Sequence, residues 1–269
     1  MDGTDRQRQN TAYCLDQVRK FSEDRYIAAQ FAAKHQHQSL IALYALATEI
    51  HRIPASVSEP TLGAIRQQWW RDALGELRNG GKPRAHPVVE SLAPLFADAQ
   101  PDDVISDAFL SMITATDELL SPGEFTSLGE VVECAARVYG NLPRAAVLLL
   151  NPSVDQETAD LLVELEALYV TSRTLAQPDK AVADTEAGVD TFQQRLGRFA
   201  RSTTDIADQV RAEWREKASQ IGPVEPEIIP AVANLALTPG YLKRMVSQKS
   251  YNPLAKRGAI FKTVLTGQF

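Results

Sequence analysis

The chain has 269 residues, 44% of them hydrophobic, and its 28 basic and 34 acidic side chains give a net charge of −6. This acidic balance argues against a nucleic-acid-binding protein, because such proteins usually present a basic surface. The hydrophobic content suffices for a sizeable core, and the length suits one large domain or two small ones.

The two cysteines and the amino-terminal segment exclude further classes. Cys14 and Cys134 lie 120 positions apart and have no CxxC partner, so neither a disulfide framework nor a zinc site is indicated. The first ten residues, MDGTDRQRQN, are polar and carry two aspartates, unlike a secretory signal or a transit peptide. The longest apolar run, AAVLLL (145–150), is far too short to span a bilayer. We therefore expect no transmembrane segment, although peripheral membrane contact stays open.

Leucine and alanine recur at spacings of three and four nearly throughout, which predicts an all-α protein. The first helix is expected over 9–21, the second from about residue 24, and the third over 37–53, where Pro54 stops it. A fourth helix follows, with Ser58 as N-cap and Asn79-Gly80-Gly81 as its end.

The rest of the chain continues the helical pattern, for nine to eleven helices in a single domain spanning 1–269. The polar, acidic segment 177–190 is predicted to be a surface loop. The remaining helical stretches are expected within 86–96, 101–120, 127–150, 155–176, 191–220, 226–246 and 252–269.

Three acidic pairs are candidate metal ligands, because residues at i and i+3 lie on one helical face. Each pair lies among other charges on an amphipathic helix, so solvent-exposed acids are the simpler interpretation. The histidines offer one pair at i, i+2, His35 and His37, which points to different sides of a helix. No metal site is expected from these residues. The acidic pairs are Glu130 with Glu133, Glu157 with Asp160, and Asp205 with Asp208.

The helix around Trp69 and Trp70 has an apolar stripe at helical spacing, which begins at Leu62 and Ile65. One interpretation is a core helix whose Asp72 is bonded to an arginine. The other is the wall of a cavity, with Arg66 and Asp72 near its mouth.

Several segments together resemble the squalene/phytoene synthase family. They are RYIAAQFA, SLIALYALATEI, SVSEPTLGAIRQQWWRDAL and HPVVESL, followed in the right order by ECAARVYGNL, LEALYVTSRTL and IIPAVANLALTPGYLKRM. The resemblance covers about residues 20 to 250. It is nearest to the bacterial members and to the mitochondrial complex I assembly factor branch.

The resemblance implies an all-α bundle around a deep apolar cavity. Active members of the family join two prenyl diphosphates head to head, and two aspartate-rich motifs hold Mg²⁺ against the diphosphates. Mg²⁺ neutralises the charge that develops on the leaving group, and it prefers oxygen ligands in octahedral geometry.

Both metal motifs are degraded in this chain. The first family motif, YxxxRxxDDxxD, aligns from Tyr44, and its later positions carry Thr48, His51, Arg52 and Ala55. Neither arginine nor alanine offers a carboxylate, and imidazole is a poor Mg²⁺ ligand. The second motif, NxxRD, meets YVTSRTLAQPD. Arg173 matches its arginine if one position is skipped, and no acid follows before residue 179.

The resemblance also suggests which residues surround the cavity. No catalytic residue, metal or cofactor is expected. The acids near these helices are expected away from the mouth: Glu49 lies about 140° around its helix from Tyr44, and Glu164 and Glu166 precede Arg173 by two turns or more. The expected cavity lining is Tyr44, Ile50, Ile65, Trp69, Trp70, Val138 and Leu168. The candidates for the mouth or for ligand binding are Tyr44, His51, Arg52, Arg66, Trp70, Asp72 and Arg173.

Two functions follow as hypotheses. The first is a non-catalytic relative that binds an apolar lipid or prenyl ligand, or a protein partner, and helps to assemble a respiratory complex. The alternative is an active, Mg²⁺-dependent transferase that makes squalene-like or phytoene-like products. The acidic amino terminus favours the bacterial cytoplasm, with the mitochondrial matrix as the alternative compartment.

Overall fold

A computed structural model describes residues 3–96, 104–121, 123–176, 191–199, 203–247 and 249–269. The predicted surface loop at 177–190 lies outside these residues. The described part of the chain is mostly helical and contains no strand, which confirms the all-α prediction. Within that part, no helix is long and apolar enough to cross a membrane.

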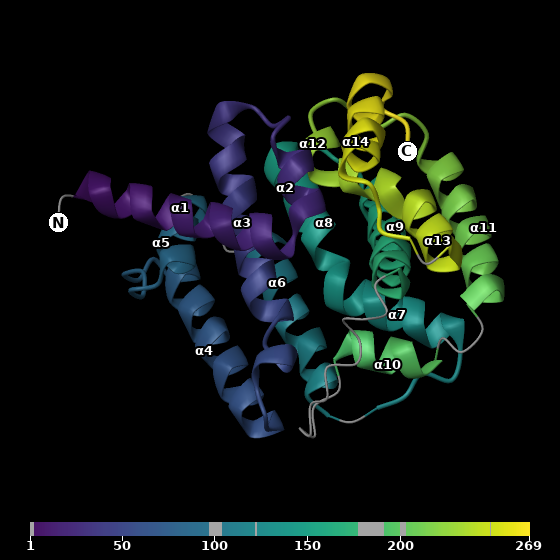
Figure 1. Cartoon of the computed structure of the whole chain (residues 1–269). Coiled ribbons are helices and arrows are strands. Elements are labelled where there is room, and N and C mark those ends of the chain that lie inside the picture. The colour runs from purple at the N-terminus through teal and green to yellow at the C-terminus, as the bar shows by residue number, and fades with distance from the viewer. Residues whose placement is uncertain (1–2, 97–103, 122, 177–190, 200–202, 248) are drawn as a thin grey trace.

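The chain folds into one helical bundle (Figure 1). Its first half contains α1 (Gly3–Phe21), α2 (Glu23–Ala29), α3 (Lys34–His51), η1 (Pro54–Ser56), α4 (Pro60–Arg78), α5 (Pro87–Phe96), α6 (Val104–Thr116) and η2 (Asp117–Leu120). The second half contains α7 (Leu128–Tyr139), α8 (Asn141–Leu150), α9 (Gln156–Leu175), α10 (Phe192–Phe199), α11 (Thr203–Ile221), α12 (Ile229–Val232), η4 (Ala233–Leu237), α13 (Thr238–Ser247) and α14 (Pro253–Thr266).

Two helices, α3 and α9, form the centre of the bundle. From Leu40 to Thr48 every residue of α3 is buried, as expected for a helix that is covered on all sides. Helices α1, α5 and α8 pack around α3, while α7, α11 and α13 pack around α9 (Figure 1). A smaller apolar cluster under α7 and α10 joins Val138 to Leu119 and Phe192.

The helix boundaries differ from the predictions in places. Helix α1 already begins at Gly3, and α3 ends at His51, shortly before Pro54 begins a 3₁₀ turn. The prediction of Ser58 as N-cap is wrong: Pro60 occupies the first position of α4, which puts Glu59 at the cap. The described residues form fourteen α-helices, more than the nine to eleven expected, partly because a 3₁₀ turn separates α12 from α13.

Five of the seven residues predicted to line the cavity are buried, whereas their placement around one apolar space stays a prediction. Tyr44, Ile50, Trp70 and Leu168 are buried in the main core. The prediction for Ile65 is wrong, because 62% of this residue is exposed. Helix α4 packs through Trp70, Ala73 and Leu77, with Gly63 against Leu120, while Leu62 and Ile65 are exposed to solvent.

Gly140 lies where α7 meets α8, close to α9, and a substitution at this position tests how tightly α9 packs there. A Cβ at this position would lie 2.4 Å from Val163 Cγ1 on α9 and 2.4 Å from the Ala136 carbonyl oxygen. We therefore expect Gly140→Ala to lower the free energy of unfolding by about 1–3 kcal/mol in urea denaturation.

Gly75→Ala on α4 is the matched control, because a Cβ there meets nothing within 4 Å. It should raise the free energy of unfolding by about 0.5–1 kcal/mol, since glycine is a poor residue for a helix interior. Equal effects of the two substitutions would contradict the close packing at Gly140.

Candidate functional site

A pocket of about 370 Å³ lies between α2, α3, α9 and α10. The last turns of α3 bring the aligned first-motif residues to this pocket, because Thr48, His51 and Arg52 follow one another along its rim and Ala55 comes just after them. Arg173 approaches from α9. Three of the candidates, His51, Arg52 and Arg173, therefore line one space.

His51 is fixed as a neutral side chain. Its Nε2 lies 3.0 Å from the carbonyl oxygen of Val138, so this nitrogen carries the proton and donates it. Its ring packs against Tyr139, with the two ring centroids 4.4 Å apart. Burial lowers the pKa of His51 to about 3, and the nearby Arg25 acts in the same direction. At neutral pH the imidazole adds no charge to the pocket.

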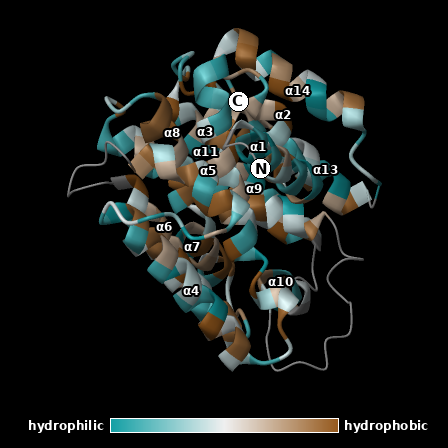
Figure 2. Cartoon of the chain, turned by 90° about the vertical axis from the view of Figure 1, so that its left-hand side faces the viewer, coloured by the Kyte–Doolittle hydropathy of each residue, from teal (hydrophilic) through white to brown (hydrophobic). Residues whose placement is uncertain are grey.

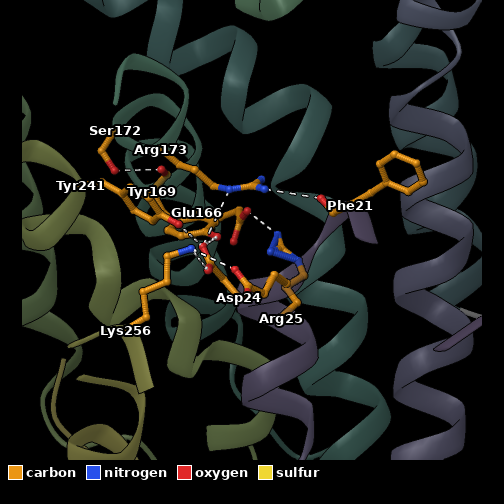
Figure 3. Close-up of polar contacts among 10 residues, drawn as sticks. Phe21, Asp24, Arg25, Glu166, Tyr169, Ser172, Arg173, Tyr241 and Lys256 are labelled. Atoms are coloured by element: carbon orange, nitrogen blue, oxygen red, sulfur yellow. Dashed lines mark hydrogen bonds and ion pairs between the residues drawn. The ribbon is translucent and has the colours of Figure 1, made fainter. Parts of the chain in front are cut away.

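The carboxylate in the pocket is that of Glu166, which forms an ion pair with Arg25 (Figure 3). Glu166 is only 1% exposed and Arg25 7%. Burial raises the pKa of Glu166 to about 7, against the opposing effect of Arg25 and Arg173. The Arg25 guanidinium also lies 5.7 Å from the ring centroid of Tyr44 and 5.8 Å from that of Tyr169.

The expected position of Glu166, well away from the mouth, is therefore wrong. It precedes Arg173 by seven residues, which is about two helical turns, so the two side chains share one face of α9. The pocket extends along that face and contacts both residues.

A second buried carboxylate, Asp24, precedes Arg25 on α2 and is surrounded by polar groups from other helices (Figure 3). Tyr169 Oη donates a hydrogen bond of 2.8 Å to it, and Tyr241 Oη donates another. Lys256 Nζ lies 2.9 Å from its Oδ1, and Arg173 Nε lies 3.8 Å from its Oδ2. Burial alone would raise the pKa of Asp24, but the charges of Arg173 and Lys256 hold it below its usual value.

Two more guanidinium groups surround the pocket near Phe21. Arg52 Cζ lies 3.6 Å from the centroid of the Phe21 ring, a cation–π contact. Arg173 Nη2 donates to the Phe21 carbonyl oxygen over 3.4 Å. With Arg25, three guanidinium groups line the pocket beside the single carboxylate of Glu166, so its described lining has a net positive charge.

These residues do not fit the Mg²⁺ ions that the aspartate-rich motifs of the family would hold. Mg²⁺ needs oxygen ligands and compensating negative charge, and Glu166 is already paired with Arg25. The aligned positions carry His51, Arg52 and Ala55, and Thr174 follows Arg173. In the part of the chain that the structure describes, three or more His, Cys, Asp or Glu side chains nowhere gather as a possible metal site.

The other candidates lie outside this pocket. Arg66 Nη1 donates to Ser56 Oγ over 2.7 Å. Asp72 accepts from Gln68 over 2.7 Å and lies 3.7 Å from Arg84, which fits the core-helix interpretation of an aspartate bonded to an arginine.

Two aromatic candidates also lie outside it. Trp70 packs against Trp69 and His86. Tyr44 is buried in the core, and its hydroxyl donates to the Ala231 carbonyl over 3.2 Å. Glu49, the acid nearest to Tyr44 in sequence on α3, accepts from Tyr13 on α1 over 2.8 Å.

Sequence reasoning missed the charged pair on α2 and its partners. The segment SEDRYIAAQFA puts an aspartate and an arginine directly before an apolar run, and this local signal could have marked Asp24 and Arg25 as buried. No local pattern singles out Tyr241 and Lys256, which reach Asp24 from 217 and 232 positions away.

The pKa of His51 predicts a pH dependence of stability. The folded value of about 3 lies below the usual 6.5, so the unfolded chain binds the proton more readily and stability is lost as pH falls from 6.5 toward 3. Between pH 7.5 and 5.0 this group should cost the wild type about 2 kcal/mol of unfolding free energy. His51→Gln, which does not titrate, should lack that part of the loss in urea unfolding. Equal losses in both proteins would contradict a His51 that stays neutral in the folded protein.

Comparison with known proteins gives a family and a fold. The sequence profile of the squalene/phytoene synthase family matches residues 18–165, more than half of the chain. NADH dehydrogenase (ubiquinone) complex I, assembly factor 6 from Bos taurus is 31% identical over 88 residues, 33% of this chain and 25% of that protein. The same factor from Mus musculus is 24% identical over 130 residues, 48% of this chain and 38% of that protein. The matched part thus spans well under half of these relatives.

Solved structures extend the similarity over the whole fold. A dehydrosqualene synthase crystallised with a ligand superposes with a TM-score of 0.70 at 14% identity, covering 98% of both chains. The squalene synthase HpnC from Alicyclobacillus acidocaldarius gives a TM-score of 0.58, also at 14% identity, over 97% of this chain and 95% of that one. At such identity these structures establish the fold, the isoprenoid synthase type, and the profile match establishes the lineage: the chain belongs to the squalene/phytoene synthase family.

Proposed function

We propose that this protein is a non-catalytic member of its family that acts as an assembly-type factor for respiratory complex I. The observation that carries the proposal is the charge of the pocket. The positions aligned with the first metal motif hold His51, Arg52 and Ala55, and among the described lining residues the one carboxylate, that of Glu166, is bound to Arg25. Similarity to the complex I assembly factors of Bos taurus and Mus musculus gives the direction of the role.

The chemistry of prenyl condensation explains why these residues favour binding over catalysis. Ionising an allylic diphosphate builds negative charge on the leaving group, and metal ions stabilise that charge in the active family members. Guanidinium groups bind phosphate well. They cannot replace the carboxylates that hold several metal ions in the active members. Glu166 could bind a metal ion only by breaking its ion pair with Arg25, which is costly in a buried site.

The same residues support a ligand with an anionic head and an apolar tail. The pocket volume of about 370 Å³ is in the range of small-molecule sites. Arg52 and Arg173 offer guanidinium groups at its edge, while Leu119, Leu142 and Val170 provide apolar surface. The proposal therefore includes an anionic lipid or prenyl compound as a ligand of the pocket, bound without a metal ion. It places the protein in the bacterial cytoplasm, with the mitochondrial matrix as the alternative.

The assembly role predicts a defect in complex I when the gene is deleted from the organism that carries it. We expect native gels of membranes to show less mature complex I and lower NADH:ubiquinone reductase activity, both restored by the wild-type chain. Arg52→Ala, which alters the pocket, should restore less than Arg66→Ala, a matched exposed arginine bonded to Ser56 outside it. Unchanged complex I in the deletion strain would contradict the role.

The non-catalytic assignment predicts no metal-dependent turnover. Purified protein incubated with farnesyl or geranylgeranyl diphosphate and Mg²⁺ should release pyrophosphate no faster than a protein-free control. Glu49→Ala and Asp72→Ala are controls outside the pocket and should give the same result as the wild type. Glu49 is bonded to Tyr13, and Asp72 is paired with Arg84. Release that required Mg²⁺ and disappeared in Glu166→Gln would show an active synthase instead.

A further inference from the structure

Helix α14 and the neighbouring end of α2 expose an unusual number of large apolar side chains. Leu254 is 74% exposed, Leu265 70% and Phe261 51%, and Phe31 beside them is 41% exposed. These four residues define the α14 surface. In Figure 2, α14 lies along the upper edge of the molecule and alternates hydrophobic with hydrophilic segments. Exposed apolar side chains gathered in one region of the surface mark an interaction site.

The apolar residues of α14 form two opposite faces. Leu254, Gly258, Phe261 and Leu265 follow one another at steps of four, three and four, so they share one side of the helix. Ile260 and Thr263 are buried on the other side, toward the core. A helix on the surface of a protein normally needs one apolar stripe, the one that faces the core. The outer stripe adds a second apolar side, which leaves most of Leu254, Phe261 and Leu265 exposed to solvent.

The outer stripe borders a shallow groove with α2. The Phe31 and Phe261 rings lie with their centroids 6.3 Å apart. Tyr26, Ile27 and Gly258 line a pocket of about 490 Å³ between the two helices. A Cβ at Gly258 would meet nothing within 4 Å, so the stripe is open to solvent at its middle.

Basic residues flank the stripe on both sides. At about 100° per residue, Arg257 lies roughly 70° to one side of the centre of the stripe and Lys262 roughly 70° to the other. Both are exposed, and α14 contains no acidic residue. Lys256 turns inward instead and pairs with Asp24 and Glu23. The outer charge of the helix is therefore positive along both edges of an apolar strip.

We propose that the α14 surface docks on the anionic surface of a lipid bilayer. An apolar strip between two basic edges is the arrangement that places apolar side chains at the headgroup–acyl boundary and cations against lipid phosphates. A second copy of this chain fits less well, because facing stripes would bring the basic edges of both copies together. The proposal concerns where the protein sits and holds whether or not it assembles complex I.

The fold holds α14 ready for such contact. Lys256 Nζ lies 2.9 Å from Asp24 Oδ1, and Val224 N donates to the Gly267 carbonyl over 2.7 Å just beyond the helix. A helix that is already formed and anchored loses little conformational entropy when it docks.

The test is co-sedimentation of the purified chain with vesicles of phosphatidylcholine alone and of phosphatidylcholine mixed equally with phosphatidylglycerol. We expect binding to the anionic vesicles, weakened by added salt. Arg257→Gln and Lys262→Gln should each weaken binding about fivefold, the effect of one basic residue near a charged membrane. Phe261→Ser with Leu265→Ser should weaken it about tenfold or more. All four side chains are exposed, so the fold should survive.

Matched controls separate this surface from general stickiness and charge. Leu62→Ser with Ile65→Ser removes two exposed apolar side chains on α4, and Arg19→Gln with Arg215→Gln removes two exposed charges elsewhere. Both pairs should leave vesicle binding unchanged.

Gly258→Leu fills the gap in the stripe and should strengthen binding to the anionic vesicles. Three results would overturn the proposal: no binding to anionic vesicles, equal losses in the α14 variants and their controls, or no effect of either kind of α14 substitution. A dimer in light scattering that Phe261→Ser with Leu265→Ser dissociates, without vesicle binding, would identify the surface as a contact between copies of the chain.

Discussion

The carboxylate of Asp24 joins parts of the chain that are far apart in sequence. It lies on α2 and accepts from Tyr169 on α9 and Tyr241 on α13, and it pairs with Lys256 on α14 (Figure 3). These contacts span 145, 217 and 232 positions. A buried carboxylate is costly unless its oxygens are bonded and its charge is paired. The helices that supply those donors are therefore held to one arrangement around α2.

The neighbouring residue, Arg25, connects this arrangement to the pocket. Successive residues of a helix point about 100° apart, so α2 directs Asp24 toward α13 and α14 and Arg25 toward Glu166. Removing Arg25 would leave an unpaired acid in the core, which is far more costly than never having had the pair. Glu166, the acid of the described pocket lining, thus serves the stability of the bundle through its pair with Arg25.

The sequence was sufficient for the fold class and for part of the site. Helical periodicity is a local pattern, and it predicts the bundle. The order of the family motifs along the chain can also be read from the sequence. It correctly predicts that His51, Arg52 and Arg173 line the same pocket. Ile65 was misplaced because the α4 stripe has a neighbouring row through Trp70 that faces the core instead. Periodicity shows that a helix has an apolar side. When two adjacent rows of side chains are both apolar, however, periodicity does not show which row faces the core.

Contacts between residues that are far apart in the chain cannot be predicted from these local patterns. Lys256 and Arg257 are adjacent, basic and on one helix, yet Lys256 turns in to Asp24 while Arg257 borders the exposed stripe. Their different roles depend on which side of α14 packs against α2, and only the tertiary structure shows this. The net charge of −6 likewise does not show which basic residues are paired inside the protein and which lie on its surface. Three guanidinium groups line the pocket, and Arg257 and Lys262 lie beside the α14 stripe. An acidic protein can therefore present basic contact regions to anionic ligands, because recognition depends on the local field and not on the total charge.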